Sequence, residues 1–351
     1  MLYVSGRNAL CTTLAFVGVA LMSTASASAA TVGGPTMRAS SEGVQYQAND
    51  DASHDIEATS VGGVITIIDH GATSFDHGLP NRCTAHAVPD GVGADCRVGD
   101  GRKTLTIRLG AGDDFVAASD LPRNVGLDVQ TGDGINAVEG GSGDDRITGG
   151  DDGDTLYGGP GWDVVRGGGG FNFMHGNSGD DIIVGGDDMD FIFGDSGSDA
   201  IEGRAELDFI YGGAGNDVID GGKDGDLLSG GSGNDDLYGS QGDDDIRGGT
   251  GNDRLNGGLG DDVLRARDGI TDVLDCGTGN DVARVDAGEV DRAKRSCDTV
   301  LQADPTVVDP EDQDDVLDES IEEAVDVVDD GEDRREGRSH MRHRPIWFHA
   351  R

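Results

Sequence analysis

An aspartate recurs every nine residues along the middle of this 351-residue chain. Between Gly140 and Arg265, fourteen consecutive units follow the frame G-G-x-G-x-D-x-U-x, in which U is aliphatic or Met. Position one is Gly in every unit, position six is Asp in thirteen units and Asn172 in the other, and position eight is always apolar. Asp carboxylates and the carbonyl groups of glycine-rich turns are hard oxygen ligands, which favour calcium over zinc or copper.

The glycines and the apolar position define the elements that would hold these ligands. Gly permits the positive backbone angles of a tight turn, so G-G-x-G-x-D predicts a turn and x-U-x predicts a short strand. Each strand has one inward side chain, and such strands must stack on copies of themselves to bury it. Two units make one coil, and stacked coils bring acidic turns to about 4.8 Å from one another. The turns repel at this spacing unless a cation lies between them.

The repeat resembles the RTX repeats of secreted calcium-binding proteins over 126 of the 351 residues. The resemblance implies an all-β fold, a parallel β-roll solenoid of nonapeptide repeats with several Ca²⁺ ions between neighbouring turns. It also implies that the turn carbonyls and the position-six Asp side chains are the metal ligands: Asp145, Asp154, Asp163, Asp181, Asp190, Asp199, Asp208, Asp217, Asp226, Asp235, Asp244, Asp253 and Asp262. The alternative is a disordered acidic tract, and the unbroken apolar position eight argues against it.

Alternate units fall on opposite edges of the predicted roll, and the two edges differ. One edge keeps Gly at position four and Asp at position six in the units that start at Gly140, Gly158, Gly176, Gly194, Gly212, Gly230 and Gly248. We expect an unbroken calcium row there. On the other edge Asn172 replaces Asp, and position four is acidic at Asp152, Asp188, Glu206 and Asp224. We expect weaker or irregular sites on that edge, recovering at Asp244 and Asp262.

Aromatic side chains follow the same even-numbered units. Position seven is predicted to point outward, and position nine adds further rings in neighbouring coils. The six residues are Phe173, Phe191 and Phe209 at position seven, and Tyr157, Phe193 and Tyr211 at position nine. We expect them to form one exposed patch, and such patches usually mark an interface. Cover by another part of the chain, self-association and an envelope ligand are the alternatives.

Residues 1–30 predict a cleaved export signal. Arg7 precedes an apolar run from Ala9 to Met22, small residues follow, and we expect cleavage after Ala27, Ala29 or Ala30. The alternative is an uncleaved membrane anchor, but the run is short for a span of roughly 20 residues. We therefore expect a secreted, extracellular protein without a transmembrane segment after signal removal, with cell-surface association as an open alternative.

Four cysteines remain after removal of the signal that contains Cys11. They fall as Cys83 with Cys96 and Cys276 with Cys297, so local pairing into two disulfides suits an exported chain. Four cysteines allow three connectivities. A zinc site that uses His86 with Cys83 and Cys96 is the alternative, and it lacks a clear ligand spacing.

The repeats have predicted neighbours on both sides. Residues 31–130 predict a small β-rich module, with strand-like segments at 61–68 and 104–108. Residues 110–116 of this module match the repeat out of register. Residues 131–139, at the start of the roll assigned to 131–265, match it weakly in register, which indicates that the roll begins early in degenerate coils. Residues 266–302 predict a disulfide-containing cap on the last coil.

Residues 303–351 predict an acidic helix and a basic tail. Between Asp304 and Asp333 the apolar residues Leu317, Ile321, Ala324, Val325 and Val328 have helical spacing, and this helix is predicted to cover an apolar surface. Residues 334–351 are basic and contain Ile346-Trp347-Phe348. This tail is interpreted as a flexible end, or as a segment that docks on the acidic roll or on an anionic envelope surface.

The formal net charge of −42 argues against nucleic acid as a partner and favours cations. Without calcium the rows of carboxylates destabilise the compact state, and with calcium the binding free energy becomes folding free energy. Extracellular modules bind calcium with dissociation constants of about 10⁻⁴ to 10⁻³ M. Our hypothesis is that the chain crosses the membrane unfolded and folds outside when it meets calcium.

Signatures of catalysis are missing from the sequence. It contains neither an H-E-x-x-H zinc motif nor a G-x-S-x-G elbow. The histidines His54, His70, His77 and His86 are expected in surface loops. We therefore predict a secreted, non-enzymatic calcium-binding protein. The alternatives are a calcium-stiffened adhesion or cell-envelope interaction protein that uses the aromatic patch or basic tail, and a small hydrolase that uses the N-terminal module.

Overall fold

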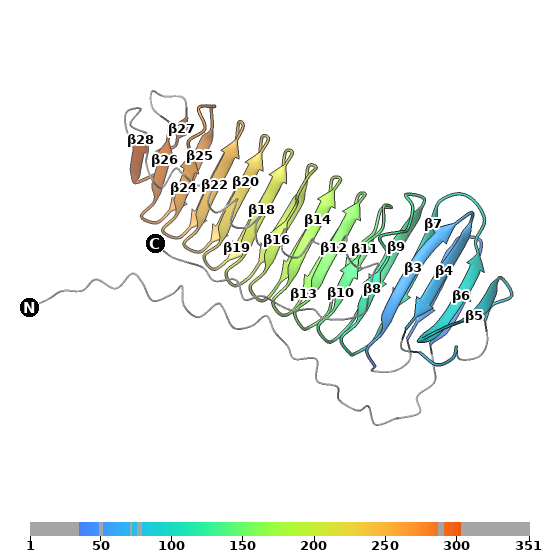
Figure 1. The fold of residues 1–351 in the computed structure, drawn as a ribbon. Helices are drawn as coiled ribbons and strands as arrows, with labels where there is room; N and C mark the ends of the chain where they lie inside the picture. The colour runs from blue at the N-terminus through green and yellow to red at the C-terminus, as the bar shows by residue number, and fades with distance from the viewer. Residues whose placement is uncertain (1–34, 49–51, 71, 76–78, 287–290, 303–351) are drawn as a thin grey trace, which may run out of the picture. The chain divides into compact units, whose positions relative to one another are not determined.

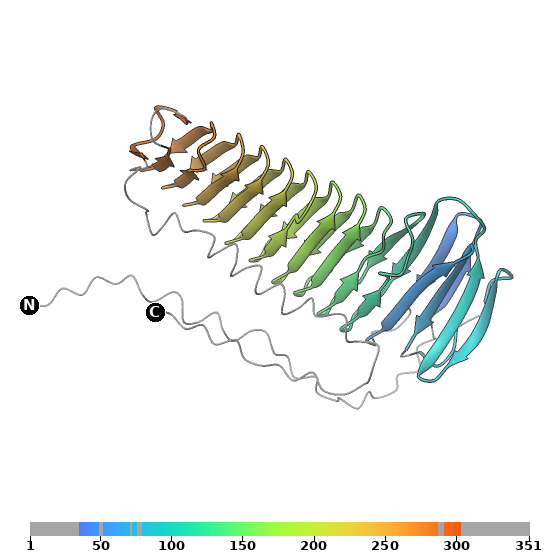
Figure 2. The same cartoon turned by 45° about the horizontal axis from the view of Figure 1, so that its top comes forward.

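The computed structural model describes residues 35–48, 52–70, 72–75, 79–286 and 291–302, and within them the fold is all-β. Two sheets contain all the named strands, one with 13 strands and one with 15. Figure 1 shows the repeat strands side by side in chain order, with β3 (Asp55–Val61), β4 (Val64–Asp69), β6 (Gly91–Arg97) and β5 (Cys83–Val88) beyond them at the N-terminal end, and Figure 2 shows the same succession from a second direction. The predicted parallel β-roll of nonapeptide repeats is confirmed.

The 13-stranded sheet contains, in spatial order, β1 (Thr36–Ala39), β2 (Gly43–Gln47), β7 (Lys103–Arg108), β9 (Val125–Gln130), β11 (Arg146–Thr148), β13 (Val164–Gly168), β15 (Ile182–Gly186), β17 (Ala200–Arg204), β19 (Val218–Lys223), β21 (Asp236–Gln241), β23 (Arg254–Leu259), β25 (Val273–Thr278) and β27 (Arg292–Ala293).

The 15-stranded sheet contains, in spatial order, β28 (Thr299–Gln302), β26 (Val282–Val285), β24 (Val263–Ala266), β22 (Asp245–Thr250), β20 (Leu227–Ser232), β18 (Phe209–Ala214), β16 (Phe191–Phe193), β14 (Phe173–Ser178), β12 (Thr155–Pro160), β10 (Ala137–Glu139), β8 (Phe115–Ala117), β3 (Asp55–Val61), β4 (Val64–Asp69), β6 (Gly91–Arg97) and β5 (Cys83–Val88).

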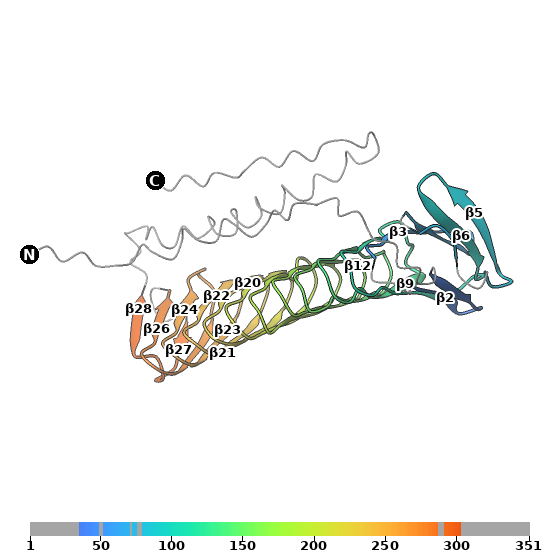
Figure 3. The ribbon, with the colours of Figure 1, turned by 90° about the horizontal axis from the view of Figure 1, so that it is seen from below.

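Successive repeats alternate between the two sheets, so each strand pairs in parallel with the strand one coil further along. Ile147 lies opposite Val165 in one sheet, and Leu156 lies opposite Met174 in the other. The view in Figure 3 shows the chain passing from one sheet to the other between β12 and β23. Because the register is constant, residues at the same repeat position form straight columns along each sheet.

The apolar position eight supplies the core between the two sheets. All fourteen of these side chains are at most 3% exposed, from Ile147 to Leu264. Burying one Val, Leu or Ile side chain stabilises a fold by about 1.5–3 kcal/mol. One apolar residue per strand is therefore enough to hold the sheets together once many coils are stacked.

Glycine is required where one turn crosses closely over the next. Gly233 has a φ of 142°, and a Cβ there would lie 1.4 Å from the carbonyl oxygen of Gly215. Any other residue at this position would be strained in its backbone and would collide with the neighbouring turn. The glycine frame thus sets how closely the acidic turns approach each other.

Both sheets continue on the N-terminal side of the repeats. In one sheet β7 pairs in parallel with β9, and in the other β3 pairs in parallel with β8. The strands β4, β6 and β5 then add in antiparallel pairing, with a disulfide between Cys83 and Cys96. The boundary placed at residue 130 remains a prediction, and the strand pairing crosses it without a break.

On the C-terminal side of the repeats, the roll ends in the strands β25 to β28. A disulfide joins Cys276 in β25 to Cys297, and Cys276 is fully buried. Both predicted cysteine pairs are present in the structure.

The expectation that His54 lies in a surface loop is wrong. His54 is 5% exposed, and its Nδ1 lies 3.0 Å from Oδ2 of Asp69, which also accepts a hydrogen bond from the hydroxyl group of Tyr46. These three residues form a buried polar cluster at the N-terminal end of the roll. His86 lies in strand β5.

Three predicted segments lie outside the described residues: the export signal at 1–30, the acidic helix and the basic tail within 303–351. His77 also lies outside them. In the part of the chain that the structure describes, no helix is long and apolar enough to cross a membrane.

Candidate metal-binding rows

The position-six aspartates form one column along each edge of the roll. Each of the thirteen is at most 3% exposed. The backbone N–H of one Asp donates to the side chain of the Asp in the next coil. The nitrogen–oxygen distances are 2.7 Å from Asp163 to Asp181 Oδ1 and 2.7 Å from Asp181 to Asp199 Oδ1. The same bond, at 2.8 Å, joins Asp190 to Asp208 on the opposite edge.

The second carboxylate oxygen of most of these residues has no hydrogen-bond partner. Oδ2 is buried and unpartnered in eleven of the thirteen: Asp163, Asp181, Asp190, Asp199, Asp208, Asp217, Asp226, Asp235, Asp244, Asp253 and Asp262. In the other two, Asp145 and Asp154, Oδ2 accepts backbone N–H bonds from Gly141 and Gly150. Within the described residues, no Lys, Arg or His forms an ion pair with a position-six Asp.

Burial makes these carboxylates hard to ionise in the absence of a cation. Loss of solvation raises the pKa of Asp163, Asp199 and Asp226 to about 8, although the backbone N–H bond that each accepts lowers it. The pKa of Asp181 and of Asp208 is raised to about 7. The carboxylates of adjacent coils add to the effect; those of Asp145 and Asp181, for example, raise the pKa of Asp163.

The donor set in these rows fits a hard divalent cation. A buried, unpartnered carboxylate oxygen is costly to keep ionised, and calcium coordinates six to eight oxygen atoms. Among the described residues, no group of three or more His, Cys, Asp or Glu side chains converges on one point. Two Asp from adjacent coils therefore cannot complete a site alone, and carbonyl groups of the glycine turns would supply the remaining ligands.

The comparison with known families agrees with this chemistry. The model of the RTX calcium-binding nonapeptide repeat matches in nine overlapping segments between residues 130 and 283. These residues belong to the RTX calcium-binding repeat family. This stretch of the chain is therefore built from calcium-binding repeats. No curated protein matches the chain.

The predicted Asp residues divide into two rows along the RTX roll. The first row contains Asp145, Asp163, Asp181, Asp199, Asp217, Asp235 and Asp253 without a gap. The second contains Asp154, Asp190, Asp208, Asp226, Asp244 and Asp262, with Asn172 between the first two. Their role as ligands remains a prediction, as does the difference in affinity between the two edges.

Sequence reasoning missed further members of these rows, among them Asp114, Asn136, Asp272 and Asp281. Each makes the same inter-coil bond; for example, Asp253 N–H donates to Asp272 Oδ1 at 2.7 Å. Burial raises the pKa of Asp114 to about 6 and that of Asp272 to about 7. The signal was present in Gly110-Ala111-Gly112-Asp113-Asp114 and in Gly277-Thr278-Gly279-Asn280-Asp281, which repeat the turn outside the nine-residue count.

In two turns of the second row, an Asn side-chain amide takes the place of the Asp carboxylate. Nδ2 of Asn172 donates to the carbonyl oxygen of Gly170 at 3.0 Å and to Oδ1 of Asp190 at 2.9 Å. Nδ2 of Asn136 donates in the same way to Gly134 at 2.8 Å and to Asp154 Oδ1 at 2.9 Å. The amide thus joins a turn carbonyl to the next carboxylate, and groups of these two kinds are the ones that would hold a calcium ion elsewhere in the rows.

The predicted aromatic residues lie on the outer face of the 15-stranded sheet, where their rings make two groups of contacts, and they are not fully exposed. The rings of Phe191 and Phe209 stack with centroids 4.6 Å apart. Phe193 is only 5% exposed and stacks on His175 at 4.6 Å, a residue that the sequence had not indicated. The other five predicted aromatic residues are half-buried. We call this set of rings, from Tyr157 to Tyr211, the aromatic strip.

Proposed function

We propose that this chain is a secreted, non-enzymatic protein that binds calcium ions between its stacked turns and folds as it binds them. The observation that carries the proposal is the pair of buried Asp rows in which Oδ2 has no partner. Such rows are unfavourable when ionised and empty, because each carboxylate repels the next and none is solvated. A calcium ion between adjacent turns removes both penalties.

The residues that would hold the ions are the position-six Asp of adjacent coils, with turn carbonyls as further ligands. Calcium supplies positive charge and an oxygen-binding shell there. The chain supplies Oδ2 of each Asp already oriented, because Oδ1 is fixed by the backbone N–H of the preceding coil. A preformed geometry of this kind lowers the entropy lost when an ion binds.

Binding and folding are coupled in this proposal. A ligand that binds only the folded state stabilises it by RT ln(1 + [L]/Kd) per site, or about 2.7 kcal/mol at one hundred times Kd. Several sites of extracellular affinity, about 10⁻⁴ to 10⁻³ M, leave the roll unstable at cytosolic calcium levels and stabilise it outside the cell. The expected export signal at residues 1–30 and the two disulfides support secretion.

Calorimetric titration of the mature chain with calcium tests the proposal. Asp199→Asn removes one charged ligand from the middle of the first row, and we expect fewer ions bound or a weaker affinity. Asp187→Asn is the matched control, since Asp187 is an exposed turn residue outside the rows. Equal loss of calcium binding in both variants would show that binding depends on the total charge of the chain and not on the Asp rows.

A second candidate function is adhesion or interaction with the cell envelope, with calcium as a stiffener of the roll. The aromatic strip favours it, because clustered apolar rings on an outer face often mark an interface. The basic residues 334–351 are the second element that this function would use. Deletion of residues 334–351 would reduce cell association under this candidate, while a protein that only binds calcium would be unaffected.

A further inference from the structure

The outer face of the 15-stranded sheet contains an apolar column and an arginine column. Position seven of successive coils places Phe173, Phe191, Phe209 and Leu227 in one line from β14 to β20. Position nine places Arg247, Arg265 and Arg284 in one line on β22, β24 and β26. The two columns belong to the same face, and the arginines lie between the aromatic strip and the C-terminal strand β28.

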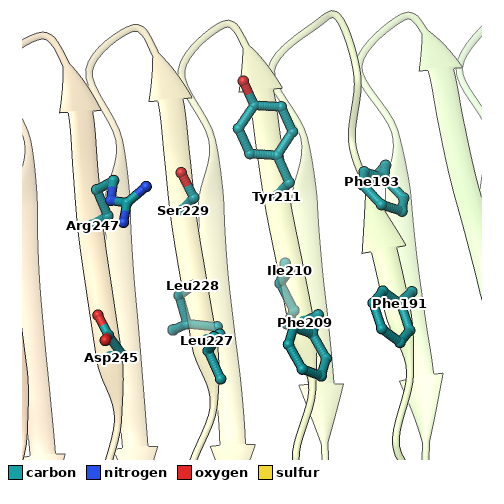
Figure 4. A pocket seen from close by; sticks show the side chains of 10 residues that line it. All are labelled: Phe191, Phe193, Phe209, Ile210, Tyr211, Leu227, Leu228, Ser229, Asp245 and Arg247. Atoms are coloured by element: carbon teal, nitrogen blue, oxygen red, sulfur yellow. The ribbon is translucent and has the colours of Figure 1, made fainter. Parts of the chain in front are cut away.

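The apolar column borders a groove of about 160 Å³. Phe191, Phe209 and Leu227 line its apolar side, and Ser229 and Arg247 lie at its other side (Figure 4). The groove therefore has an apolar floor, with Arg247 and Asp245 at one end (Figure 4). This combination fits a segment that has apolar side chains and carboxylates in close succession.

Three arginines in line are unusual in a chain with 26 Lys and Arg against 68 Asp and Glu. Adjacent strands are about 4.8 Å apart, and like charges directly opposite one another destabilise a sheet. Asp245 forms an ion pair with Arg265 within the face. Further carboxylates laid along the column would stabilise it.

The chain itself supplies such a segment directly after the sheet. The strand β28 ends at Gln302, beside β26, and Leu301 lies opposite Arg284. Half of the residues from 304 to 333 are Asp or Glu and none is Lys or Arg. Leu317, Ile321 and Val325 are spaced for one face of a helix.

The length of this segment suits the distance it would cover. The strand order from β28 to β16 includes six steps, which amount to about 29 Å at 4.8 Å per step. Residues 311–328 span roughly 27 Å as a helix at 1.5 Å per residue, and residues 303–310, in which Pro305 and Pro310 disfavour a helix, add roughly 26 Å if extended. The segment therefore reaches the aromatic strip from the end of β28.

We propose that residues 304–328 bind back on the outer face of the 15-stranded sheet of the same chain. Their apolar side chains enter the groove beside Phe209 and Leu227, and their carboxylates lie along Arg247, Arg265 and Arg284. A second copy of the chain is the less favourable occupant, because two chains of formal charge −42 repel each other. The bound segment would keep the aromatic strip out of contact with other molecules.

Photocrosslinking of the full mature chain, with calcium present, tests this docking. Phe209 is replaced by benzoylphenylalanine, which keeps an aromatic ring in the groove, and the crosslinked peptides are mapped by mass spectrometry. We expect a crosslink within one chain to a peptide from residues 304–333. The same probe at Tyr238, on the 13-stranded sheet, is the matched control and should not reach this segment.

Two sets of variants separate the contribution of the apolar side chains from that of the arginines. Leu317→Asp with Ile321→Asp should reduce the crosslink yield at least fivefold, and Arg247→Glu with Arg265→Glu should reduce it similarly. Arg254→Glu, on the other sheet, should leave the yield unchanged. Strand content is measured on every sample by circular dichroism, so a roll that fails to bind calcium or to fold is distinguished from one that fails to dock.

A crosslink between two chains would overturn the proposal in favour of self-association. Absence of any crosslink to residues 304–333 in folded samples would overturn it as well, and would leave the strip open to an envelope partner. An intramolecular crosslink that persists unchanged in both variant sets would show proximity without the proposed contacts and would also contradict it.

Discussion

The side-chain amide of Asn172 lies 2.9 Å from Oδ1 of Asp190 in the next coil and 3.0 Å from the carbonyl oxygen of Gly170 in its own turn. At the corresponding place in the other row, Asp163 and Asp181 present carboxylates, each with a buried and unpartnered Oδ2. The roll therefore contains two kinds of contact between adjacent turns. An amide joins them by hydrogen bonds alone, whereas we propose that a pair of ionised carboxylates is joined by a calcium ion.

Asn172→Asp should convert the first arrangement into the second. At a calcium level that just folds the unchanged chain, we expect the variant to be less stable by about 1–3 kcal/mol, because a buried hydrogen-bond donor is lost and a carboxylate is added. In excess calcium we expect the stability to recover. Thermal unfolding at limiting and at excess calcium measures both effects, since the chain is expected to have little strand structure in chelator at neutral pH. Asn216→Asp adds the same charge at an exposed turn position and should change neither; an equal response of the two variants would contradict the bridging role of Asn172.

Protons and calcium should compete for the rows. Burial raises the folded-state pKa of Asp163 and Asp226 from 3.8 to about 8, so the calcium-free fold holds these protons more tightly than the unfolded chain does. Protonation therefore stabilises the calcium-free roll; this stability is present below pH 4 and is lost as pH rises through about 6 to 8. In chelator, we expect the strand signal and a thermal unfolding transition at pH 5, and we expect both to be lost as the pH is raised to 7 and 8.

Calcium affinity should rise from pH 5 to pH 8, because the proposed ligand is the ionised carboxylate and not the protonated one. Titrations at pH 5, 6, 7 and 8 measure it, and protons should be released on binding. An affinity that is independent of pH would show that the buried rows are not the calcium sites.

The glycines at turn crossings should tolerate no side chain. Gly215 has a φ of 143°, and its Cβ would lie 1.6 Å from the carbonyl oxygen of Gly197. Gly215→Ala should destabilise the roll by about 2–5 kcal/mol through backbone strain and collision. Gly62→Ala is the control: Gly62 has a φ of 58° with no atom within 4 Å of its Cβ position, so it should cost only about 1–2 kcal/mol. Denaturant unfolding in calcium compares them.

The disulfide between Cys276 and Cys297 should stabilise the end of the roll in particular. Replacing both residues by Ala should destabilise the fold by about 2–4 kcal/mol. Because each coil contacts only its neighbours, hydrogen exchange should increase first in β25 to β28. A uniform increase along the roll, equal to that after removal of Cys83 and Cys96, would contradict a local role.

The nine-residue repeat predicted the roll because its signal is local and recurs many times. Position eight, from Ile147 to Leu264, predicted the buried core, and position six predicted the two rows of Asp side chains. Asp114 and Asp272 were missed because the count breaks around them. Asp114 bonds to Asn136, 22 residues later, and Asp253 bonds to Asp272, 19 residues later. The strand register is kept there, since the extra residues lie outside the paired strands.

Contacts between distant segments were beyond the sequence pattern. His54 was expected at the surface, yet it is buried against Asp69 through a contact that no periodicity indicates. Phe193 was expected to be exposed at position nine, and it is buried against the ring of His175. In both cases the side chain is placed by neighbours that only the stacked strands bring together.

Circular dichroism of the mature chain in chelator, followed by addition of calcium, tests the central claim most directly. We predict little strand signal at neutral pH in chelator and a cooperative gain of strand signal as calcium rises toward the millimolar range. A chain with full strand signal in chelator, unchanged by calcium, would contradict the proposal that calcium binding drives the folding of the roll.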